Sequence, residues 1–188
     1  GIDIRYGLSD VEARLAEIAD EIERKSSIGY RRISANIIDD LIQGRVHAES
    51  SSSSPDIVSL TQFFSRVDQA YRTRKRAKEL ESLYDTGEIE SQQNEILRYF
   101  LSKLSVVIDE TKELEANIEK FVEIVNEYLT RSSEEKRFTY KPNEMRVEII
   151  NSWTKNAVAM DDLSSGEKQI VSLFAYLFLY SGRKIILI

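Results

Sequence analysis

The spacing of apolar residues along most of the chain limits its fold more than any other feature. Between about Ser9 and Thr130, apolar residues recur every three or four positions, which is the period of a helix with one buried face. The clearest runs are Val11, Leu15, Ile18 and Ile22, then Ile33, Ile37, Ile38, Leu41 and Ile42, and then Ile57, Leu60, Phe64, Val67 and Tyr71. We therefore expect this part of the chain to be helical.

Local signals predict where these helices begin and end. Ser9 and Glu12 have the spacing of a capping box, in which each side chain satisfies a free backbone N–H at a helix start. Gly29 predicts an interruption and Gly44 an end. Pro55 predicts the start of the next helix, because proline is favoured at the first helical position.

The later runs predict an antiparallel pair of helices. One helix is expected from about Pro55 to Tyr84 and the other from about Glu88 to Leu129, joined by a polar tip that contains Gly87. The row of the first helix, which includes Leu60 and Phe64, is expected to face a row on the second. That second row contains Val107, Leu114, Ile118, Phe121 and Val125. Alternating steps of three and four are typical of a helix packed on a helix, and these rows are short enough to predict a stubby arm.

A short segment after the helices has the alternation of β-strands. Phe138 and Tyr140 alternate with polar residues, and Val147 and Ile149 do so again after a turn that begins at Pro142. These residues predict a hairpin with one apolar face. Trp153 follows in an expected loop, where we expect its ring to pack against the core or the edge of the sheet.

Composition narrows the classes of function. The chain of 188 residues has no cysteine and a single histidine, His47, so no disulfide or metal site is predicted. Its net charge of −6 disfavours a surface mainly for nucleic acid. One basic cluster interrupts this: Arg72, Arg74, Lys75, Arg76 and Lys78. We interpret it as a solvated helix face, with contact to a phosphate backbone or a partner as the alternative.

Membrane and export signals are not visible in the sequence. No apolar stretch reaches the roughly 18 residues of a membrane span, and Gly1–Arg5 lacks the pattern of a signal peptide. A cytoplasmic location and no membrane partner are therefore expected.

Residues 164–169 combine several features of an anion site. Ser164 and Glu167 repeat the spacing of a capping box, and the helix that they begin directs free N–H groups outward. Gly166 allows close approach to the backbone, and Lys168 adds a positive charge. An ordinary capped helix that binds nothing remains the alternative.

The segment that follows is strongly apolar. Residues 170–180 are apolar on nearly every side of a helix, which predicts burial on nearly every side. Ser181 and Gly182 end that helix, and Lys184–Ile188 is expected to form a central parallel strand.

Asp162–Gln169, the apolar helix and Lys184–Ile188 together resemble the segment of ABC-type ATPases that runs from the signature motif to the Walker B strand. Ser165 in place of the first glycine and Glu167 at the last position resemble RecF/SMC-like and overcoming-lysogenisation-defect-like ATPases, which include subunits of bacterial anti-phage systems. The resemblance implies an α+β fold that is mostly α. Residues 1–130 would be a helical insertion, and residues 131–188 part of the P-loop ATPase lobe.

The same resemblance implies which residues bind ATP. In such proteins the signature loop contacts the γ-phosphate of ATP held by the partner subunit of a dimer. Ser164 would donate its hydroxyl and Gly166 its N–H, while Lys168 would help to neutralise charge. The residues implied at this trans site are Leu163, Ser164, Ser165, Gly166, Glu167 and Lys168.

The resemblance also implies what this chain lacks. No catalytic residue is expected within it, because the phosphate-binding loop is absent and the Walker B carboxylates are expected just after Ile188. ATP and Mg²⁺ would belong to the intact parent protein, and this chain alone is expected to be inactive.

The expected function is therefore part of a homodimeric ATPase in DNA repair or anti-phage defence, with DNA and an effector nuclease or another defence protein as further partners. The alternative is a helical interaction module with a vestigial signature. An Asp-Glu pair directly after Ile188 would favour the ATPase. The ATP-binding subunit of a membrane transporter fits less well, because the helical insertion is long and the Glu167-Lys168 variant is atypical of that class.

Overall fold

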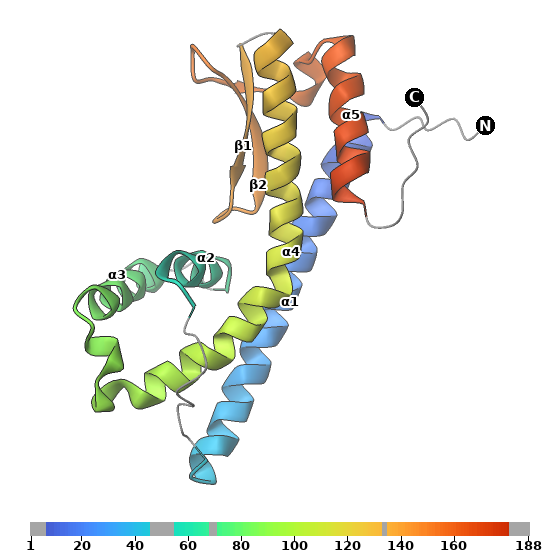
Figure 1. The fold of residues 1–188 in the computed structure, drawn as a ribbon. Coiled ribbons are helices and arrows are strands. Elements are labelled where there is room, and N and C mark those ends of the chain that lie inside the picture. The colour runs from blue at the N-terminus through green and yellow to red at the C-terminus, as the bar shows by residue number, and fades with distance from the viewer. Residues whose placement is uncertain (1–6, 46–54, 68–70, 133–134, 181–188) are drawn as a thin grey trace. The chain divides into compact units, whose positions relative to one another are not determined.

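A computed structural model describes residues 7–45, 55–67, 71–132 and 135–180 of the chain. Most of these residues are helical, and a three-stranded antiparallel sheet accompanies the helices (Figure 1). This confirms the predicted α+β class with predominant helix. The elements in chain order are α1 (Leu8–Ile42), α2 (Ile57–Val67), α3 (Tyr71–Asp85), the 3₁₀ turns η1 (Glu88–Glu90) and η2 (Gln92–Asn94), α4 (Glu95–Ser132), β1 (Lys136–Lys141), β2 (Arg146–Asn151), β3 (Ala157–Val158), the 3₁₀ turn η3 (Met160–Asp162) and α5 (Ser165–Leu179).

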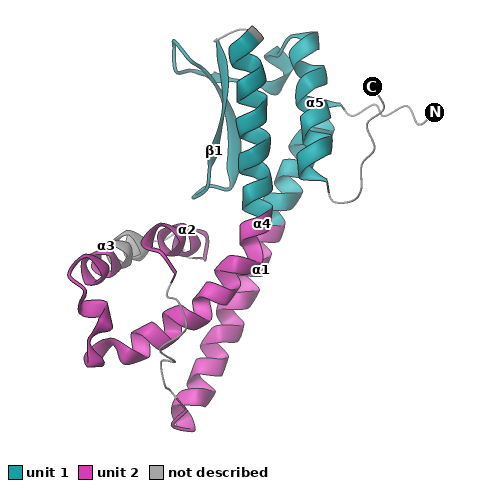
Figure 2. Ribbon diagram, viewed as in Figure 1, with its two compact units in different colours: residues 1–20, 114–188 teal, residues 21–113 magenta. Residues whose placement is uncertain are grey.

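The chain forms two compact units (Figure 2). Unit 1 contains residues 1–20 and 114–188, and unit 2 contains residues 21–113. The long helices α1 and α4 each contribute one part to each unit. This grouping differs from the predicted division at residue 130, because the second part of α4 packs on the sheet. The rings of Phe121 on α4 and Phe138 on β1 meet edge to face with their centroids 6.1 Å apart.

The sheet of unit 1 contains the hairpin that the alternating residues predict. β1 pairs with β2 from Lys136 opposite Asn151 to Lys141 opposite Arg146, and β2 pairs with β3. Phe138 and Ile149 are opposite each other and buried. The hydrophobic core of unit 1 also includes Val11, Leu15 and Ile18 of α1, Ile118, Val125 and Leu129 of α4, and Val171, Ala175 and Leu179 of α5.

The outer edge of β1 is closed by a side chain from α4. The amide of Asn126 donates to the carbonyl oxygen of Phe138 at 2.8 Å, and the N–H of Phe138 donates to the Asn126 Oδ1 at 2.8 Å. An exposed strand edge offers its backbone groups to other chains. Asn126 therefore removes one such pair at β1.

Unit 2 has a core of its own in which parts of α1 and α4 run antiparallel. Gly29 lies against Val107, and Asp40 accepts a 2.6 Å hydrogen bond from the hydroxyl of Tyr99. Later residues of α1 thus meet earlier residues of α4. The core also contains Ile33 and Ile37 of α1, Leu60, Phe63 and Phe64 of α2, and Leu101 and Leu104 of α4.

The predicted interruption at Gly29 is wrong, since α1 is continuous from Leu8 to Ile42. A Cβ atom at position 29 would lie 2.3 Å from the Cγ1 of Val107, closer than non-bonded atoms approach. Gly29 is therefore explained by the close approach of two helices and not by a break in one of them.

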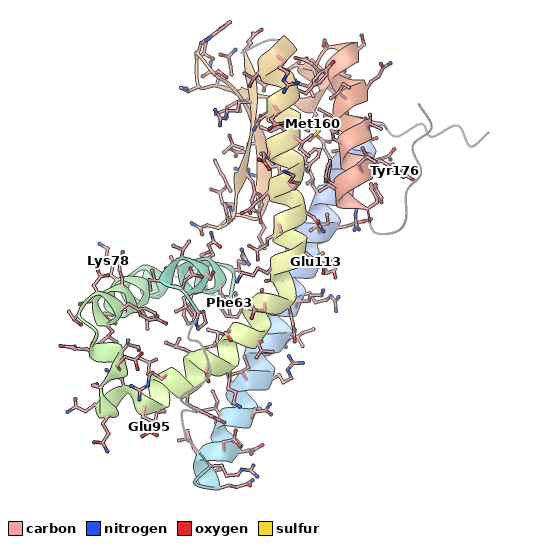
Figure 3. The ribbon with its side chains drawn as sticks, in the orientation of Figure 1. Phe63, Lys78, Glu95, Glu113, Met160 and Tyr176 are labelled. Atoms are coloured by element: carbon pink, nitrogen blue, oxygen red, sulfur yellow. The ribbon has the colours of Figure 1, made fainter. Side chains whose placement is uncertain are left out.

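The prediction of one helix over residues 55–84, paired with another over 88–129, is wrong in two respects: the first segment is not one helix, and α1 shares the packing. Residues 55–84 contain two helices, α2 and α3, which contact each other. The apolar row of α2 packs into the core that α1 and α4 share, and Phe63 is fully buried there (Figure 3). Periodicity gives the buried face of a helix but not the helix that packs against it. The apolar face of α1 fits α2 as well as the face of α4 does.

Several helix boundaries differ from the prediction by a few residues. Ser9 and Glu12 lie inside α1, and the N–H of Gly7 instead donates to the Asp10 carboxylate at 2.9 Å. α2 begins after Asp56, whose carboxylate accepts the N–H of Ser59 at 2.9 Å, and not at Pro55.

The ends of α1 and α3 agree with the prediction. Gly44 and Gly87, which follow these helices, have φ of 65° and 72°, a left-handed conformation that favours glycine. The returning helix α4 begins at Glu95 and not at Glu88, because η1 and η2 intervene.

Trp153 lies in the loop between β2 and β3, as predicted, but its side chain is 70% exposed and does not pack on the core. The Asn151 side chain accepts the N–H groups of Trp153 and Thr154 at 3.0 and 2.9 Å. These bonds hold a tight turn that projects the indole ring into solvent.

Candidate functional site

The candidate site is the start of α5. The turn η3 and the buried residue Leu163 precede this helix and position it. In the turn η3, the N–H of Leu163 donates a hydrogen bond to the carbonyl oxygen of Met160 at 3.2 Å. Leu163 is buried, whereas Ser164, Ser165 and Gly166 are exposed. The turn and Leu163 therefore position three consecutive exposed residues at the beginning of a helix.

The predicted capping box is present at this helix start. The Ser164 hydroxyl oxygen accepts the N–H of Glu167 at 3.3 Å, and the Ser164 N–H donates to Glu167 Oε2 at 2.6 Å. The Ser164 carbonyl accepts the N–H of Lys168 at 2.9 Å. Ser164 is exposed, so a ligand can reach its hydroxyl.

The N–H groups of Ser165 and Gly166 are the free donors of the loop. They belong to the first turn, where no preceding helical carbonyl exists to accept them, and neither has a hydrogen-bond acceptor among the described residues. A Cβ at Gly166 would meet nothing within 4 Å. The positive end of the α5 dipole and two free donors thus face open space.

Lys136, at the start of β1, binds two residues of the loop. Its ammonium group donates to the carbonyl oxygen of Asp162 at 2.9 Å and to Glu167 Oε2 at 3.0 Å. The side chains of Lys136 and Glu167 are only 17% and 11% exposed. Lys136 therefore binds both Asp162, which directly precedes Leu163, and the carboxylate of Glu167, which belongs to the capping box.

The pKa of Glu167 reflects this arrangement. Burial alone would raise the pKa, because it disfavours the charged carboxylate. The N–H of Ser164, the Lys136 ammonium and the Ser164 hydroxyl outweigh burial, so the pKa lies below its ordinary value of 4.5. Glu167 is therefore ionised at neutral pH, as its role in the cap requires.

The far end of α5 is attached to α1. The guanidinium of Arg14 donates to the carbonyl of Leu179 at 2.9 Å and lies 5.1 Å from the centre of the Tyr180 ring. A cation at the C-terminus of a helix satisfies a free carbonyl and complements the dipole. Both ends of α5 are thus held within unit 1.

The prediction that α5 is buried on nearly every side is wrong for the described structure. Its buried apolar residues are Val171, Ala175 and Leu179, which lie four residues apart on one face. Leu173 is 45% exposed, and Phe174, Tyr176, Leu177 and Phe178 are only partly buried. One face of this helix is therefore buried, and the others are partly open.

All six residues predicted for the site lie together at the start of α5, but with different roles. Leu163 and Glu167 are structural, because one is buried and the other is engaged by Ser164 and Lys136. No sequence pattern at the start of α5 indicates Lys136, which lies 31 residues before Glu167 in the chain. Residues two positions apart in a strand lie on the same face, so Lys136 shares the face of Phe138. A lysine on an apolar face requires an acidic or hydrogen-bonding partner.

The ATP phosphate that the resemblance implies fits this loop, since exposed unbonded donors and a glycine without neighbours suit an anion. No group of three or more carboxylate, histidine or cysteine side chains among the described residues could hold a metal ion. The expected strand at residues 184–188 and His47 lie outside the described residues, as do the side chains of Arg72–Arg76.

Comparison of the chain with models of protein families, with curated proteins and with solved structures finds no match. Among the described residues, no helix combines the length and the apolar character needed to cross a membrane.

Proposed function

We propose that this chain contributes a phosphate-contacting loop to a dimerising ATPase of the ABC type. One observation carries the proposal: the N–H groups of Ser165 and Gly166 remain unbonded and exposed at the start of a 15-residue helix. The capping box and Lys136 fix these donors in place, so little ordering is needed when a phosphate arrives. DNA repair or anti-phage defence is the proposed setting.

The loop would act by binding charge rather than by transferring protons. The Ser164 hydroxyl, the N–H groups of Ser165 and Gly166 and the α5 dipole stabilise negative charge on a phosphate. Lys168, half-buried in the first turn of α5, adds a positive charge near them. ATP would supply the transferable phosphoryl group, and Mg²⁺ would be held by residues outside the described part of the chain.

The isolated chain is expected to show no ATP hydrolysis above background, because no phosphate-binding loop accompanies the signature. Phosphate release by the purified chain, compared with a Ser164→Arg control, measures this directly. Turnover by the chain that the substitution abolishes would contradict the assignment.

A substitution at Ser164 tests the loop in a longer protein that also carries the phosphate-binding loop. Ser164→Arg places a bulky side chain where phosphate must bind and removes the cap, at a cost of about 1 kcal/mol. ATP-dependent dimerisation and hydrolysis should be lost, while ATP binding to the monomer persists. Mass in solution with and without ATP, together with nucleotide affinity, distinguishes these results. A variant that dimerises normally would refute the role of the loop.

Exposed apolar side chains in unit 2 favour a second candidate function, that of a helical interaction module. Ile42 at the end of α1 is 77% exposed, and Ile38 and Val58 are also exposed. In that case the loop at α5 would be an ordinary cap, and Ser164→Arg would leave partner binding unchanged. An Asp-Glu pair encoded directly after Ile188 would favour the ATPase.

A further inference from the structure

A groove in unit 1 lies between the first part of α1 and strands β2 and β3. Its volume is about 610 Å³, which is within the range of roughly 300–1,000 Å³ typical of binding sites. Its apolar walls include Leu15, Ala16, Ala19, Met145, Val158 and Met160. The small alanine side chains on α1 leave the space, and the groove is separate from the start of α5.

The two methionines of the chain both line this groove. Methionine has a flexible, polarisable side chain and adapts to different apolar partners. Met160, labelled in Figure 3, is buried, whereas Met145 is half-buried in the turn between β1 and β2. Met145 has a φ of 50°, a left-handed conformation that is uncommon for residues other than glycine.

The groove runs beside a strand edge that lacks the closure seen at β1. The sheet order is β1-β2-β3, so β3 has no strand on its other side among the described residues. Because Phe138 directs its N–H and carbonyl to Asn126, the alternation of an antiparallel ladder makes Ile149 and Val158 a hydrogen-bonded pair. The N–H and carbonyl of Ala157, one residue earlier, then face away from β2 and are available to another strand.

The rim of the groove is acidic. Glu12, Asp20, Glu144 and Glu148 line it together with one basic residue, Arg146. Arg146 is engaged by Glu144 and Glu148, and Lys141 also binds Glu148 at 2.6 Å. Glu12 and Asp20 have no ion-pair partner within the described part of the chain. The uncompensated negative charge of the groove therefore lies on its α1 side.

We propose that this groove binds an extended basic segment of a partner protein, which adds to β3 as a fourth strand and lies along α1. The partner backbone would bond to Ala157, and its side chains would face α1. This proposal does not depend on an ATPase function.

The spacing along α1 defines the sequence that such a segment needs. Glu12, Ala16 and Asp20 lie at intervals of four residues on one face of α1. Eight residues of helix span about 12 Å, and four residues of a strand span about 13 Å. Two basic residues four positions apart in the strand would therefore reach Glu12 and Asp20. An apolar residue midway between them would meet Ala16.

A synthetic nonapeptide tests this prediction. It has lysines at its third and seventh positions, valine at its fifth and threonines elsewhere, and the control peptide has glutamates in place of the lysines. Titration at low salt, followed by fluorescence anisotropy, should show saturable binding of the lysine peptide below about 1 mM. Bound peptide should slow hydrogen exchange at the amide of Ala157 and leave that of Phe138 unchanged.

Matched variants on α1 complete the test. Ala16→Phe should fill the groove and weaken binding at least about tenfold, while Ala13→Phe, on the same helix but outside the groove, should change affinity less than about twofold. The double variant Glu12→Lys with Asp20→Lys should instead bind the glutamate peptide. The proposal is overturned by absence of saturation, by equal binding of both peptides to the unmodified chain, or by binding that leaves Ala157 unprotected.

Discussion

Lys136 shows how one side chain can determine the geometry of a loop that is distant in sequence. Its ammonium group bonds to the carbonyl of Asp162 and to the carboxylate of Glu167, and both side chains of the ion pair are mostly buried. Exposed ion pairs contribute little to stability, but breaking a buried pair leaves an uncompensated charge. The start of α5 should therefore depend on Lys136 more than on any exposed lysine.

Replacing Lys136 with methionine keeps the length of the side chain and removes the charge. We expect Lys136→Met to lower the free energy of unfolding by about 2 kcal/mol, because Glu167 is left partly buried without its cation. Urea denaturation measures the loss. Lys120→Met is the matched control, since Lys120 pairs with Glu123 on the surface of α4 and should change stability by less than about 0.5 kcal/mol. Equal losses in the two variants would show that Lys136 has no special role.

The pH dependence of stability follows from the lowered pKa of Glu167. The folded-state pKa lies below the ordinary value of 4.5, so the stabilisation is fully present above that value and is lost as pH falls through the lower folded-state pKa. Glu167→Gln should remove this contribution, and stability should then fall less steeply below pH 4.5. Urea denaturation at several pH values tests the difference. Parallel curves for the two proteins would contradict the assigned interactions.

At the scale of single elements, some local features could be predicted, whereas long-range partners could not. The capping box at Ser164 and the alternation in β1 and β2 involve neighbouring residues, and both are present in the structure. The pairing of α1 with α4, and the contact of Lys136 with Asp162, join residues far apart in sequence. Periodicity identifies a buried face without its partner, which is why α2 was assigned to α4 alone, whereas its apolar row packs into a core that α1 and α4 share.

Gly29 provides a test of the α1–α4 contact. Alanine usually stabilises a helix interior by about 1 kcal/mol relative to glycine. Here its Cβ would lie 2.3 Å from Val107 Cγ1, so we expect Gly29→Ala to destabilise the chain by roughly 1–3 kcal/mol. The double variant Gly29→Ala with Val107→Ala should lose less stability than the sum of the losses of the two single variants. Thermal unfolding of the four proteins measures this coupling, and a stabilised Gly29→Ala would place the helices further apart.

At the scale of the whole molecule, unit 1 carries both surfaces to which we assign binding. The start of α5 presents backbone donors for an anion, and the groove between α1 and β3 presents an acidic, apolar surface for a strand. α1 contributes to both, since Arg14 holds the end of α5 while Glu12 and Ala16 line the groove. The helical core of unit 2 is formed separately.

The loop at Ser164–Gly166 is proposed to act on ATP held by another subunit, and mixing two inactive variants of the longer protein tests this role. One variant carries Ser164→Arg with its phosphate-binding loop intact, and the other lacks the phosphate-binding lysine but keeps Ser164. A mixed dimer then contains one complete site, formed by the phosphate loop of the first variant and the signature of the second. If the loop acts on ATP of the partner subunit, mixing should restore ATP hydrolysis that neither variant shows alone. Hydrolysis that stays at background in the mixture, although mixed dimers form, would contradict this role.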